Sequence, residues 1–86
     1  MRYQLIIKAD PEQSIAALAK HTSTLFGPAP EIVGSDSSAP YETSLIVDFA
    51  GETRTAIESA LNIWFVEPPY KPPFDLGSLL FWSRVN

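Results

Sequence analysis

The stretch RYQLIIKADPEQSIAALAKHTSTLFGP, residues 2–28, changes its hydrophobic pattern at Asp10. Residues 2–9 alternate about a β-branched centre, which predicts a strand. Beyond Asp10, apolar residues recur at spacings of three and four, which predicts an amphipathic helix over 10–27. A strand that leads directly into a helix indicates a domain built from both kinds of element.

The ends of this predicted helix carry capping signals. Asp10 suits the N-cap, Pro11 suits the first helical position, and Gln13 stands where a capping-box partner belongs. Gly27 fits the left-handed position after the last turn, and Pro28 prevents continuation. The predicted buried stripe consists of Ile15, Leu18, Ala19, Thr22, Leu25 and Phe26.

Four further elements follow along the chain. Residues 31–35 suggest a short strand, and GSDSSAP (34–40) has the composition of a turn or loop. Residues 43–50 and 78–85 alternate and predict strands, whereas 52–64 has the period of a second helix. The apolar stripe of that helix would be Ala56, Ile57, Ala60, Leu61 and Trp64.

The order strand, helix, strand, strand, helix, strand predicts a single α+β domain over residues 1–86. It matches the βαββαβ unit of a ferredoxin-like sandwich, with an antiparallel or mixed sheet and both helices on one face. Right-handed crossovers would place the first and third strands side by side and parallel. Another α+β arrangement with a different strand order stays open, because 31–35 is a weak strand and 63–67 has strand character too.

Strand alternation assigns residues to the two faces of the predicted sheet. We call the face away from the helices the open face. The set expected beneath the helices is Tyr3, Leu5, Ile7, Leu45, Val47, Phe49, Leu79, Phe81 and Val85. The set expected on the open face is Gln4, Ile6, Lys8, Ser44, Ile46, Asp48, Leu80, Trp82 and Arg84.

The open face is the predicted partner-binding surface. Ile6, Ile46, Leu80 and Trp82 would form an apolar centre inside a charged rim, as in a protein interface. Trp82 would be its energetic centre, because tryptophan is enriched in binding hot spots, and Arg84 would belong to the rim. The alternative is that these are single exposed apolar residues, which are common on protein surfaces.

The stretch WFVEPPYKPPFDLG, residues 64–77, pairs prolines with aromatic residues. We interpret it as a stiff, packed connection between the second helix and the last strand. A free arm that docks into an aromatic groove is the alternative. In either case Tyr70 and Lys71 are further candidates for partner contact.

Composition and charge exclude several classes of function. The 86 residues carry a formal net charge of −4 without an acidic run, which disfavours nucleic-acid binding. The chain has no cysteine, which excludes disulfides, thiolate metal sites and cysteine nucleophiles. Neither a signal peptide nor a membrane-spanning stretch is visible, so we expect a cytoplasmic protein.

Catalytic and metal-binding patterns are incomplete in this sequence. The single histidine, His21, falls one step off the helical stripe, where a partly exposed surface residue is expected. Asp48 would form an ordinary surface ion pair with Lys8 if their strands were parallel. The carboxylates lack metal-ligand spacing and no phosphate loop is present, so we expect neither a metal nor another cofactor.

Three functions are compatible with these observations. The first is a small non-enzymatic binding or regulatory protein, such as an inhibitor that blocks a larger host complex. It would meet a protein partner, or a second copy of itself, through the open face. The alternatives are a ligand-sensing module and a small dimeric ferredoxin-like enzyme that uses His21, Asp48 or Tyr70 for acid–base chemistry.

Overall fold

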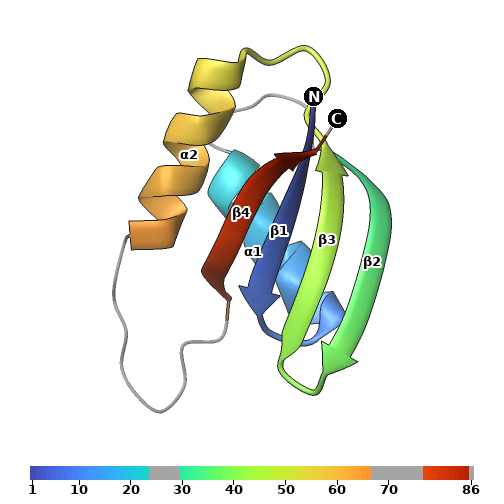
Figure 1. The fold of residues 1–86 in the computed structure, drawn as a ribbon. Helices are drawn as coiled ribbons and strands as arrows, with labels where there is room; N and C mark the ends of the chain where they lie inside the picture. The colour runs from blue at the N-terminus through green and yellow to red at the C-terminus, as the bar shows by residue number, and fades with distance from the viewer. Residues whose placement is uncertain (24–29, 67–76, 86) are drawn as a thin grey trace.

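The computed structural model describes residues 1–23, 30–66 and 77–85. Its element order confirms the predicted βαββαβ arrangement, which is that of a ferredoxin-like α+β fold. Both helices pack on one face of the sheet (Figure 1). The elements are β1 (Arg2–Lys8), α1 (Pro11–Ser23), β2 (Glu31–Ala39), β3 (Glu42–Asp48), α2 (Arg54–Val66) and β4 (Ser78–Val85).

The strand order is β2-β3-β1-β4, and each neighbouring pair is antiparallel. The first and third strands are therefore adjacent, as predicted, but their predicted parallel direction is wrong. Tyr3 lies opposite Val47 in an antiparallel ladder. The physical reason is that the chain returns through α1 so that β2 runs parallel to β1. The short turn at residues 40–41 then reverses it, so β3 runs against both strands.

Strand β2 is longer than its composition predicted. It runs through the segment GSDSSA, which was expected to form a turn, as far as Ala39. Its register against β3 shifts between Ile32 and Gly34 and again between Asp36 and Ala39. Pairing with β3 therefore overrides the local turn signals, and the two irregularities accommodate the surplus residues.

Helix α1 begins as its capping signals predicted. The backbone N–H of Gln13 donates to Asp10 Oδ1 at 2.8 Å. Its buried side is rotated from the predicted stripe, since Ser14 is buried while Ile15 and Ala19 are exposed. The Ser14 hydroxyl donates a hydrogen bond to the carbonyl of Ala9 at 3.3 Å, so this small polar residue can face the sheet.

Small side chains bring α1 close to the start of β4. A Cβ added to Gly77 would lie 3.4 Å from the Cβ of Ala17, which leaves little room there. Gly77 also has a φ of 93°, a conformation that favours glycine. Leu25 and Phe26, which the sequence placed on the buried stripe, lie outside the described residues.

Helix α2 begins after Thr53, whose Oγ1 accepts the N–H of Ala56 at 3.2 Å. The helix continues to Val66, so the alternative of a strand across 63–67 is wrong for residues 63–66, and residue 67 lies outside the described residues. Ala56 is exposed, but the remaining residues of the predicted stripe are buried. These residues are Ile57, Ala60, Leu61 and Trp64.

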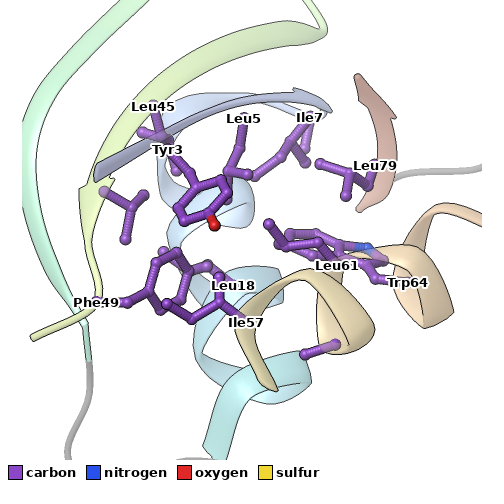
Figure 2. Packing of buried hydrophobic residues seen from close by; sticks show 13 residues of the cluster. Tyr3, Leu5, Ile7, Leu18, Leu45, Phe49, Ile57, Leu61, Trp64 and Leu79 are labelled. Carbon is purple, nitrogen blue, oxygen red and sulfur yellow. The ribbon is translucent and has the colours of Figure 1, made fainter. Parts of the chain in front are cut away.

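The core lies between the sheet and the two helices (Figure 2). Leu5 and Leu45 of the central strands point toward Leu18 of α1 and toward Ile57 of α2. Burial of one such side chain contributes about 1.5–3 kcal/mol. The buried apolar cluster consists of Tyr3, Leu5, Ile7, Ala9, Leu18, Leu45, Val47, Phe49, Ile57, Ala60, Leu61, Trp64 and Leu79.

Candidate functional site

The open face of the sheet is defined by the register of β1 and β3. Gln4 lies opposite Ile46, and Ile6 lies opposite Ser44. Opposed residues of an antiparallel pair project to the same side of the sheet. Ile6 and Ile46 therefore lie on the open face, where alternation placed them, and both are half-buried. Their part in partner binding stays a prediction.

A β-bulge in β4 changes which of its residues reach that face. Ile6 lies opposite Phe81 and Ile7 lies opposite Leu79, so Leu80 has no partner of its own on β1. One extra residue in a strand shifts its alternation by one position. The predicted faces are consequently wrong for the residues that follow Leu80.

Trp82 lies on the helix side of the sheet, not on the open face. It stands opposite the buried Leu5, and its ring centroid is 6.0 Å from that of Tyr3. Half-buried, it packs against the core cluster. Arg84 lies opposite Tyr3 and therefore faces the same way. Because of the bulge, the predicted placement of Trp82 and Arg84 on the open face is wrong. The contact of these two residues with a partner stays a prediction.

Phe81 is the large apolar residue that the bulge brings to the open face. It lies opposite Ile6 and is 47% exposed, although alternation placed it beneath the helices. Val85, opposite Arg2, moves to the open face in the same way. Leu80, at the bulge itself, is 43% exposed. An exposed aromatic residue and leucine thus stand beside the half-buried Ile6.

Charges are unevenly distributed over the open face. The register places carboxylates from β2 and β3 on one half and the cations of β1, Arg2 and Lys8, beside them. The half formed by β2 and β3, which we call the acidic half, attracts basic groups. Its carboxylates are Glu31, Asp36, Glu42 and Asp48.

Asp48 is held at the end of β3 by the start of the chain. Its Oδ1 accepts a hydrogen bond from the Met1 ammonium at 3.3 Å, and its Oδ2 lies 3.8 Å from Arg2 Nε. The expected pair with Lys8 is wrong, because in the antiparallel ladder Lys8 stands at the opposite end of β1. These exposed ion pairs contribute little to stability.

A second polar cluster links β1 to α2. The Tyr3 hydroxyl donates to Glu58 Oε2 at 2.8 Å, and Arg54 Nε donates to the same oxygen at 2.7 Å. These hydrogen bonds from Arg54 and Tyr3 lower the pKa of Glu58. Burial, followed by donation to Glu58, raises the pKa of Tyr3. The phenol therefore stays protonated and the carboxylate ionised near neutral pH.

The variant Tyr3→Phe is expected to lower the free energy of unfolding by about 1 kcal/mol at neutral pH, the usual net value of one hydrogen bond. Because the pKa of Glu58 is lowered in the folded state, its contribution to stability is lost as pH falls through that pKa. Because the pKa of Tyr3 is raised in the folded state, its contribution to stability is lost as pH rises through that pKa. The free energies of unfolding of the variant and the wild type, measured with urea, should therefore differ most near neutral pH.

The matched control for this measurement is Tyr41→Phe. Tyr41 is an exposed tyrosine in the turn between β2 and β3, so loss of its hydroxyl should leave stability unchanged. A difference between Tyr3→Phe and wild type that stayed constant from acid to alkali would contradict the assigned hydrogen bond.

Two of the candidate acid–base residues, His21 and Asp48, do not come together. The ring of His21 stacks on that of Trp64 at a centroid distance of 4.7 Å and an interplanar angle of 12°, on the helix side. Asp48 lies on the open face, so the sheet separates the two. Within residues 1–23, 30–66 and 77–85, no three His, Asp or Glu side chains gather as metal ligands. Tyr70 and Lys71 fall outside the described residues, as does most of the proline-rich stretch.

In comparison with known proteins, the chain matches no family model, no curated protein and no solved structure. In the part of the chain that the structure describes, neither helix is long and apolar enough to cross a membrane. The candidate site therefore rests on the geometry of the open face alone.

Proposed function

We propose that this protein is a non-enzymatic binding protein that acts through contact with another protein at its open face. The observation that carries this proposal is the exposed Phe81 beside Ile6, on a face that continues into the acidic half. Apolar residues within a charged surround are typical of an interface core and its rim.

The chemistry of the face supports one kind of partner. Ile6, Ile46 and Phe81 offer apolar contact, while the carboxylates of β2 and β3 favour lysine and arginine. The partner is therefore a protein that presents an apolar side chain flanked by basic residues. A small domain that covers such a surface regulates its partner by occupying it, and inhibition of a larger host complex is one form of this role.

The test is affinity capture from the native source, followed by reconstitution with the purified partner. Ile46→Lys places a cation in the centre of the open face, within the acidic half, and should weaken binding about tenfold or more. Wild-type binding should also fall as salt rises, because the acidic half contributes by charge. Affinity is measured by titration calorimetry at two salt concentrations.

The matched control is Ile63→Lys, the same substitution on α2. Ile63 is 54% exposed and lies on a helix, away from the open face. The Ile63→Lys variant should bind the partner with wild-type affinity. Circular dichroism should show that both variants are folded. Equal binding by Ile46→Lys and Ile63→Lys would refute the open face as the contact surface.

A further inference from the structure

The two edge strands of the sheet differ in how they discourage pairing with another strand. Natural edges are protected by charges, prolines and irregular backbone. Strand β2 carries Glu31 and Asp36 and has two shifts of register. Strand β4 has one such shift, at Leu80, but it begins with SLLFWS, residues 78–83, which contains neither a charge nor a proline. Its outer edge pairs with none of the described strands (Figure 1).

We propose that the outer edge of β4 binds β4 of a second copy of this chain. The two strands pair antiparallel about a two-fold axis at Phe81, which joins the two four-stranded sheets into one sheet of eight strands. Such an isologous contact uses the same residues from both copies. The backbone N–H and C=O groups of the two edges then satisfy one another.

The single charge of β4 favours antiparallel pairing of its two copies. Arg84 is the single charged residue of the strand. About an axis at Phe81, Arg84 lies opposite Ser78 of the second copy, whereas a parallel pairing in register would place Arg84 against Arg84. Like charges directly opposite each other destabilise a strand pair. The antiparallel arrangement therefore suits this sequence as its own partner.

The exposure of the β4 side chains indicates which residue lies at the two-fold axis. A two-fold axis perpendicular to the sheet leaves one residue opposite its own copy. Trp82 is already packed against Tyr3, and Leu80 is the bulge residue, where the backbone is irregular. Phe81 keeps a partner on β1, Ile6, and is 47% exposed, so two copies of its ring at the axis cover each other.

This inference shares Phe81 with the proposed function, so the two are separated at Ile46, which lies on β3 away from the axis. The same two-fold axis keeps both open faces on one side of the joined sheet. The acidic halves, on β2 and β3, then lie at its two far ends, because β2 is the edge opposite β4. The dimer therefore offers two equivalent surfaces to a partner, and Ile46→Lys should leave dimerisation unchanged.

The absence of cysteine allows a direct test of the contact. The single variant Phe81→Cys places two thiols opposite each other at the axis, so mild oxidation should convert most of the protein to a covalent dimer. Val33→Cys is the matched control, because Val33 is 38% exposed on the other edge strand, and it should stay largely monomeric. Non-reducing gel electrophoresis measures both. Equal cross-linking of the two variants, or none of either, overturns the proposal.

A second measurement does not depend on oxidation. Wild-type protein followed by sedimentation from low micromolar to millimolar concentration should change from the monomer mass to twice that mass. Phe81→Lys, which sets two ammonium groups side by side at the axis, should raise the dissociation constant about tenfold or more, with its circular dichroism unchanged. A wild type that stays monomeric throughout, or a Phe81→Lys variant that dimerises equally well, overturns the proposal.

Discussion

Replacement of Trp64 by alanine is expected to lower the free energy of unfolding by about 3–5 kcal/mol. The indole is 3% exposed, and its Nε1–H donates to the carbonyl of Gly77 at 2.8 Å. One of its faces is stacked on His21. Loss of the ring therefore removes one contact between the helices together with the hydrogen bond that anchors the start of β4. In a domain of 86 residues this is a large part of the total stability.

Urea unfolding monitored by circular dichroism measures this change. Trp64→Phe is the informative comparison, since it keeps an aromatic ring in the core but cannot donate to Gly77. Its loss of unfolding free energy should be intermediate, at about 1–3 kcal/mol, because the partly buried carbonyl of Gly77 is left without its donor. A Trp64→Ala protein that unfolded at the same urea concentration as wild type would contradict the assigned packing.

Leu5→Ala is expected to lower the free energy of unfolding by about 2–5 kcal/mol, the usual cost of truncating a fully buried leucine. Leu5 lies on β1, which pairs with a strand on each side, and its side chain has 0% exposure. The cavity would open at the centre of the sheet, where the neighbouring strands cannot move in to fill it. The midpoint of thermal or urea unfolding should fall steeply.

The neighbouring residue provides the control for this prediction. Ile6→Ala truncates a half-buried side chain on the open face, one position along the same strand. Its cost should be about 1 kcal/mol or less, since little of the core is opened. Equal losses for Leu5→Ala and Ile6→Ala would contradict the assignment of the two faces of β1.

The elements that sequence predicted well have strong local signals. Asp10 caps α1 as its position before Pro11 indicated, because a cap depends only on residues within one turn. The alternation of β1 and β3 placed Ile6 and Ile46 on the open face correctly, since neither strand slips against the other. The order of these elements was sufficient to predict the ferredoxin-like arrangement.

The candidate site could be predicted only in part, because β4 contains four successive apolar residues. In LLFW, residues 79–82, alternation gives no sign of which side chain faces the helices. The bulge at Leu80 exchanges the positions of Phe81 and Trp82, and it exists only in the pairing of β4 with β1. A run that is apolar on both faces is the one sequence signal that indicated this ambiguity.

The sequence by itself determined the number, type and order of the elements, since periodicity and capping act between residues that are near each other in the chain. Tertiary structure decided the antiparallel direction of β3, the extension of β2 through a turn-like segment, and the faces of β4. It also decided the hydrogen bond between Tyr3 and Glu58, 55 positions apart. These features depend on strand pairing and helix packing between distant segments, whose register local patterns do not encode.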